Sequence, residues 1–99
     1  MIFAVTRGSG LAWASSRPLR EQDGWTEHAA FMDALADEGF ALLGGPLGGG
    51  DFHRALLIVD ADSEDEVHAR LADDPWTTTP VLKTLAVEPW EVLIGDPQR

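Results

Sequence analysis

Three short apolar runs limit most strongly what this chain can fold into. They are IFAV at residues 2–5, FALL at residues 40–43 and ALLIV at residues 55–59, each too short for a helix and long enough for a strand. Each run has apolar residues at both alternating sets of positions, whereas a strand with one wet face alternates apolar and polar side chains. The sequence therefore predicts a sheet that is covered on both faces.

The first strand is expected from Met1 to Thr6, because residues 7–10 (RGSG) are typical of the start of a loop. This loop continues to Gln22 without hydrophobic periodicity, and long connections of this kind often carry function. A helix is then expected to begin near Asp23, a residue type that caps helices, and to end at Gly39.

A glycine-rich stretch at residues 44–51 separates the second and third apolar runs and predicts a hairpin. Beyond it, Ser63 and Glu66 have the capping-box spacing that begins a second helix. That helix should stop before Asp73-Asp74-Pro75, because the residue before a proline is disfavoured in the α region. The last strand is expected from Lys83 to Ile94.

The resulting order of elements is βαββαβ, which predicts an α+β fold with two helices on one face of a four-stranded antiparallel sheet. The 99 residues suffice for one domain, spanning residues 1–99, and leave nothing to cover the second sheet face. A second copy of the chain is the expected cover, so the sequence predicts a homodimer.

The composition of the chain limits the kinds of partner and the location that can be expected for it. Seventeen acidic residues against seven basic ones give a net charge of −10, which argues against nucleic acid as a partner. No apolar run approaches the ~18 residues that a membrane span needs. The first residues lack the features of a signal peptide, so a cytoplasmic location is expected. The absence of cysteine excludes disulfides and thiolate metal sites.

His28 is the first candidate catalytic residue. At 100° per residue it falls between Met32 and Leu35 on the apolar side of the first helix, while Asp33 and Asp37 lie on the other side. An imidazole among apolar groups needs a partner for its ring nitrogens. The functional interpretation is a general base or acid, and the alternative is a core histidine bonded to a neighbour.

Asp74 is the second candidate catalytic residue. The loop that leaves the second helix can reach back towards the first helix, and Pro75 restricts the backbone of the acid that precedes it. Asp74 is therefore predicted to contact His28 and to orient it. The alternative is a turn residue, because Asp-Pro often begins turns.

Five further residues are candidates for binding a small ligand. Arg17 and Arg20 lie in the long loop and would suit a carboxylate on the ligand, although the alternative is solvated loop charges. Trp76 follows the Asp-Pro pair and is expected to form a wall of the cleft. In the hairpin, Gly45 and the adjacent Pro46 would let a ligand or a partner backbone come close.

No cofactor is expected. The glycine-rich hairpin lacks the lysine and the serine or threonine of a phosphate-binding P-loop and precedes a strand. No metal is expected either, because neither His53 nor His68 is followed four residues later by a histidine or carboxylate that would complete a site.

The sequence resembles the YCII family. The family pattern corresponds here to His28, Glu38-Gly39, Gly45-Pro46, Asp74-Pro75-Trp76 and Val87-Glu88-Pro89-Trp90. The resemblance implies a ferredoxin-like fold, a dimeric α+β barrel and a cleft in which His28 and Asp74 form a catalytic pair.

Three functions remain open from the sequence. The first is a cofactor-independent lyase or isomerase that uses the His-Asp pair for proton transfer on a small cyclic or carboxylated metabolite. The second is a non-catalytic ligand-binding or regulatory dimer, because a fold alone does not define a function. The third is a purely structural interaction module that would have no concave site.

Overall fold

Four antiparallel strands form one sheet in the order β2-β3-β1-β4. The computed structural model describes residues 1–48 and 54–96. The strands are β1 (Ile2–Ser9), β2 (Ala41–Pro46), β3 (Arg54–Asp60) and β4 (Leu82–Pro89). The helices are α1 (Trp25–Asp37), α2 (Glu64–Ala72) and α3 (Pro75–Thr78), with a 3-10 turn, η1 (Leu19–Glu21), before α1.

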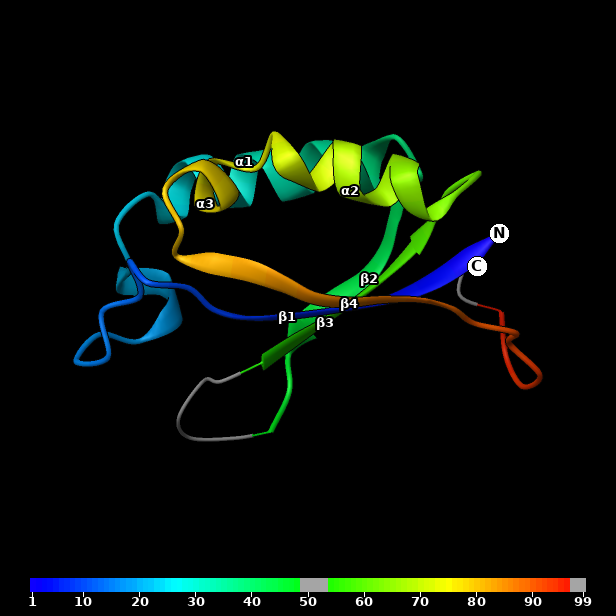
Figure 1. Cartoon of the computed structure of the whole chain (residues 1–99), viewed down its shortest axis with the longest axis horizontal. Coiled ribbons are helices and arrows are strands. Elements are labelled where there is room, and N and C mark those ends of the chain that lie inside the picture. The colour runs from blue at the N-terminus through cyan, green and yellow to red at the C-terminus, as the bar shows by residue number, and fades with distance from the viewer. Residues whose placement is uncertain (49–53, 97–99) are drawn as a thin grey trace.

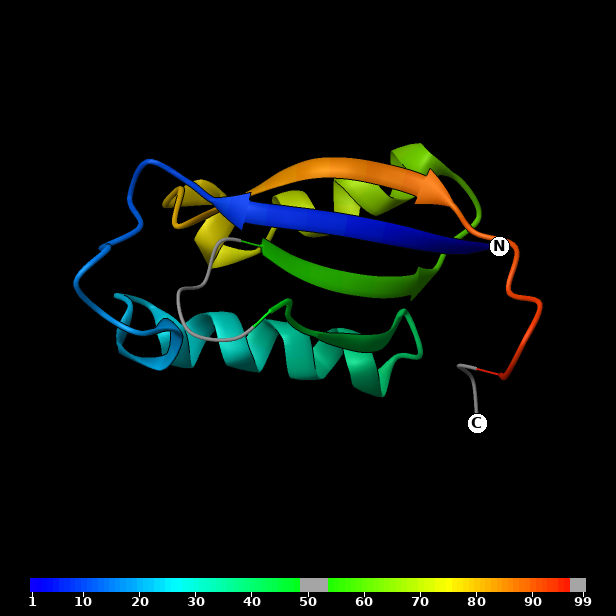
Figure 2. The same cartoon turned by 90° about the horizontal axis from the view of Figure 1, so that it is seen from below.

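All three helices lie on the same side of the sheet (Figure 1), and α1 runs beside the β2 edge while α2 lies nearer β4 (Figure 2). The core lies between these two layers. In the β1–β3 register Phe3 pairs with Val59 and Val5 with Leu57, and all four side chains are buried against the helices. The α+β, ferredoxin-like fold predicted from the sequence is therefore confirmed.

The predicted ends of two strands are wrong. β1 continues past Thr6 to Ser9, because its last residues pair with both β3 and β4. β4 ends at Pro89 and does not reach Ile94, because its only neighbour, β1, begins at Ile2. The Trp90 amide donates to the Ile2 carbonyl at 2.9 Å. Beyond this bond the chain leaves the sheet, and Ile94 is 94% exposed.

The predicted hairpin is present, but its first strand is longer than expected. β2 runs through Gly44 and Gly45 to Pro46 and pairs with β3 in antiparallel fashion. A bulge between Ala41 and Leu43 shifts the register of this pair. The remaining glycines of the stretch, at positions 49 and 50, and His53 lie outside the described residues.

The first helix begins one residue later than predicted. Its N-cap is Gly24, whose φ of 82° suits glycine, and not Asp23. His28 and Leu35 are the buried residues of α1, and Asp33 and Asp37 are exposed as expected.

The second helix has the predicted start and end. The Glu66 amide donates to the Ser63 hydroxyl at 3.1 Å, and the Glu66 carboxylate accepts from the Asp62 amide at 2.8 Å. A four-residue helix, α3, follows directly where the sequence predicted only a loop.

The helix-free face of the sheet carries apolar side chains. Residues that alternate with the buried Phe3 and Val5 point to this face, and there Ala4 pairs with Ile58 and Ile58 with Leu43. Leu43 is 59% exposed. None of the helices in residues 1–48 and 54–96 is both long and apolar enough to span a membrane.

Candidate active site

Asp74 forms the centre of the candidate active site. It is fully buried, at 0% exposure, between α2 and α3. Its side chain caps α3 by accepting the Trp76 amide at 2.9 Å, and Pro75 occupies the first turn, where its missing N–H costs nothing. The Asp-Pro-Trp sequence thus fixes the carboxylate at the start of a short helix.

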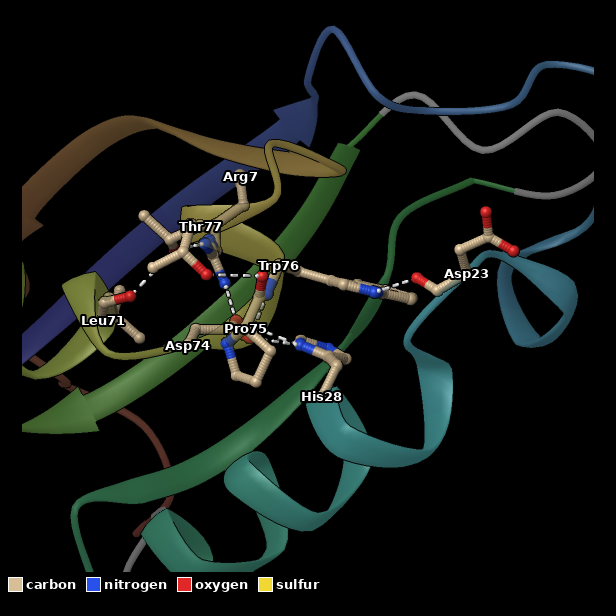
Figure 3. Close-up of polar contacts among 9 residues, drawn as sticks. Arg7, Asp23, His28, Leu71, Asp74, Pro75, Trp76 and Thr77 are labelled. Atoms are coloured by element: carbon tan, nitrogen blue, oxygen red, sulfur yellow. Dashed lines mark hydrogen bonds and ion pairs between the residues drawn. The ribbon is translucent and has the colours of Figure 1, made fainter.

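His28 approaches this carboxylate from the first turn of α1. Its Nδ1 lies 2.9 Å from Oδ1 and 3.0 Å from Oδ2 of Asp74 (Figure 3). The contact predicted between these two side chains is therefore present. Because an ionised carboxylate only accepts hydrogen bonds, Nδ1 must carry the proton, and Nε2 is left as the second ring nitrogen.

Arg7 is the site residue that sequence reasoning missed. Its guanidinium is 3% exposed and donates through Nη1 to Oδ2 of Asp74 at 2.7 Å (Figure 3). Through Nη2 it donates to the Thr77 hydroxyl at 2.7 Å, and that hydroxyl donates to the Leu71 carbonyl at 2.8 Å. Asp74 is thus shared between a histidine and a permanently charged arginine.

The Asp74 carboxyl is ionised at neutral pH. Burial raises its pKa. The hydrogen bonds from His28, Arg7 and the Trp76 amide, together with the charge of the imidazole when protonated, lower the pKa by more than burial raises it. The net effect places the pKa of Asp74 below its ordinary value of 3.8.

Trp76 packs against one face of the imidazole. The two rings are stacked with their centroids 4.0 Å apart and their planes 9° from parallel. The indole Nε1 donates to the Asp23 carbonyl at 2.7 Å, just before α1 begins (Figure 3). The sequence predicted Trp76 as a wall of the cleft, but the structure places it behind His28, where it fixes the ring.

A cavity of about 370 Å³ opens beside His28, between α1 and the β2 and β3 strands. Charged side chains at its wall are Arg7, Arg20 and Asp33, and the apolar side chains include Leu19, Trp25, Met32, Leu57 and Leu82. The cavity is therefore mostly apolar, with three charged side chains at its wall.

The structure brings together only part of the predicted ligand-binding set. Arg20, Gly45 and Pro46 line the cavity, and the Arg20 guanidinium lies 5.8 Å from the Trp25 ring. Arg17 does not line it, because its guanidinium pairs with the exposed carboxylate of Asp23 at 3.1 Å.

The described residues contain no group of three or more histidines, cysteines, aspartates or glutamates that could hold a metal ion. His68 has one carboxylate neighbour. Its Nε2 lies 3.6 Å from the carboxylate of Glu64, four residues earlier on α2. The pair is exposed and has no third ligand among the described residues.

The chain belongs to the YCII family, because the model of the YCII-related domain matches residues 9–91. Among solved structures it is similar to 5-chloro-2-hydroxyhydroquinone dehydrochlorinase, TftG, from Burkholderia phenoliruptrix AC1100, in complex with 2,5-dihydroxybenzoquinone. The two chains are 31% identical, with 92% of this chain and 94% of the other covered and a TM-score of 0.66. The curated proteins contain no match.

Proposed function

We propose that this chain is a cofactor-independent enzyme that removes a proton from a small cyclic substrate and expels a leaving group. His28 acts as the general base and Asp74 orients it. The observation that carries the proposal is the hydrogen bond between His28 Nδ1 and the buried Asp74 carboxylate beside a cavity. This bond fixes the tautomer in which Nε2 has the free lone pair that a base requires.

The size and lining of the cavity support a single aromatic or quinone-like ring as substrate. About 370 Å³ lies within the range of small-ligand sites, and apolar side chains from α1 and the sheet suit a flat ring. Arg20 at the wall suits an ionised hydroxyl or carboxyl group on that ring. The similar dehydrochlorinase, whose structure is a complex with 2,5-dihydroxybenzoquinone, makes a hydroxylated ring the first class to test.

The proposed reaction balances without an oxidant or a reductant. For a chlorinated hydroquinone, His28 takes a proton from one ring hydroxyl and returns it to the ring carbon that bears chlorine. Removal of a proton from a second hydroxyl then expels chloride with the bonding pair of the carbon–chlorine bond. The sum is the loss of HCl, with the ring electrons ending in a quinone. Isomerisation of a ring ketone would use the same base without a leaving group.

The test uses 5-chloro-2-hydroxyhydroquinone as substrate and 2,5-dihydroxybenzoquinone as ligand, the two compounds linked to the similar enzyme. Chloride release is followed with the purified chain, and ligand binding is followed by quenching of tryptophan fluorescence, because Trp25 lines the cavity. We expect binding together with release that exceeds the uncatalysed rate. Binding without release would instead support a non-catalytic ligand-binding protein, and absence of both would contradict the proposed substrate class.

A homodimer is part of the same proposal. The helix-free sheet face presents apolar side chains such as Leu43, and a second copy would remove them from water. We expect sedimentation at micromolar concentrations to give about twice the chain mass of 10.7 kDa. A single species of monomer mass over that range would contradict the dimer. Leu43, which also lines the cavity, is exposed enough that Leu43→Asp should shift a true dimer towards monomer.

A further inference from the structure

Arg7 has no role in the proposed reaction as described so far, although it is buried and bound to the Asp74 carboxylate. It extends from β1 on the same face as Phe3 and Val5 and lines the cavity. The opposing residue on β3 is Ala55, whose small side chain leaves room for the guanidinium.

We propose that Arg7 is a positioning residue that keeps His28 neutral, with its proton on Nδ1, by neutralising the charge of Asp74. The inference rests on the proposed function, in which His28 must offer a free lone pair at Nε2. It concerns a property of the imidazole that is measurable without any substrate.

The first step of the argument is the charge balance. Arg7 and Asp74 are joined at 2.7 Å, at 3% and 0% side-chain exposure, so water screens their interaction little. A guanidinium does not lose its proton in proteins. The buried carboxylate therefore has a permanent counter-charge whether or not His28 is protonated.

The second step is the effect on the histidine. A buried carboxylate alone would favour the charged imidazole, because an opposite charge within ~4–6 Å stabilises the protonated form. The Arg7–Asp74 pair is neutral overall, so it stabilises a positive charge on His28 much less than an unpaired carboxylate would. His28 can then donate one Nδ1 proton to Asp74 and remain uncharged.

Other charged groups at the cavity wall do not replace this effect. Arg20 from η1 and Asp33 from α1 both line the cavity, but within the described residues the Asp74 carboxylate is bonded by Arg7, His28 and the Trp76 amide. Both are exposed, so solvent screens them more than it screens the buried pair. Asp74 contacts His28 directly, and Arg7 acts on His28 through the Asp74 carboxylate that the two share.

The bonding of the guanidinium agrees with a role in holding Asp74. Its Nη1 and Nη2 groups bind Asp74 and Thr77. Among the buried side-chain nitrogen and oxygen atoms of the described residues, Nε of Arg7 is the one without a hydrogen-bond partner. Leaving a buried donor unpaired lowers stability. The position of the guanidinium therefore favours its contact with the Asp74 carboxylate, even though one of its N–H donors stays without a hydrogen bond.

The test is an NMR titration of the His28 imidazole in the full chain, with His28→Gln to assign its signals. Arg7→Gln should move the titration midpoint up by roughly one pH unit or more, a tenfold gain in proton affinity, because the Asp74 charge is no longer balanced. Arg7→Lys keeps the charge and should stay close to the wild type. Arg70→Gln removes a distant arginine that pairs with Glu38, and should leave the midpoint unchanged.

An unchanged or lowered midpoint in a folded Arg7→Gln variant would overturn the inference and leave Arg7 as a purely structural residue. If Arg7→Gln does not fold, Thr77→Val removes only the second anchor of the guanidinium and should raise the midpoint by a smaller amount. No change in that variant would also count against the inference. Chloride release is a separate measurement. If the proposed substrate does not react, the titration still tests the role of Arg7.

Discussion

His28→Gln is expected to lower the turnover of the hydroquinone substrate by about 10²- to 10⁴-fold, the usual contribution of a positioned general base. Glutamine has a similar length and retains a group able to donate to Asp74, but it cannot take up a proton at neutral pH. Binding of the quinone ligand should change little, because Arg20 and the apolar wall remain. The measurement is kcat for chloride release beside the ligand Kd for each variant.

His68→Gln is the matched control, since it removes an exposed histidine from α2 and should leave kcat unchanged. A loss of less than tenfold in a folded His28→Gln protein would remove the general-base role. It would then favour the alternative from the sequence, in which the histidine is a structural or recognition group.

The order of elements and the contact between His28 and Asp74 could be predicted from the sequence for a specific physical reason. Helical spacing placed an imidazole among apolar residues, and a buried imidazole requires a polar partner. The Asp-Pro pair after the second helix offered an acid with a restricted backbone, and the fold brings these two elements to the same end of the sheet.

Arg7 could not be recognised as a site residue, because the sequence predicts that the first strand ends at Thr6. A basic residue followed by glycine resembles the start of a loop, and strand ends depend on pairing with residues far along the chain. The signal was nevertheless present. Phe3, Val5 and Arg7 follow the two-residue period of a strand, which places the arginine on the buried face.

The position of Trp76 and the end of β4 could not be predicted from local sequence. α3 has only four residues, too few for a helical period, so nothing indicated that Trp76 points towards His28. The alternation of Trp90, Val92 and Ile94 suggested a longer strand. β4 ends where the neighbouring strand, β1, begins. The local alternation of side chains carries no information about that pairing.

Asp74→Ala is expected to destabilise the protein by about 3–5 kcal/mol, because it leaves the buried guanidinium of Arg7 without its carboxylate. It also removes the cap of α3 and the partner of His28 Nδ1. Asp73→Ala changes the exposed neighbouring acid and should stay within about 0.5 kcal/mol of the wild type. Urea unfolding at one fixed protein concentration measures both, since a dimer would make stability depend on concentration.

The origin of the stability loss in Asp74→Ala can be tested by a second substitution and by changing the pH. Arg7→Met in the Asp74→Ala background removes the uncompensated charge and should recover most of the loss. The lowered pKa of Asp74 means that its contribution is fully present above the ordinary value of 3.8 and is lost as the pH falls below it. The stability gap between wild type and Asp74→Ala should therefore be constant near neutral pH and narrow in acid. A double variant no more stable than Asp74→Ala, with a gap that does not narrow in acid, would show that charge balance with Arg7 is not what Asp74 contributes.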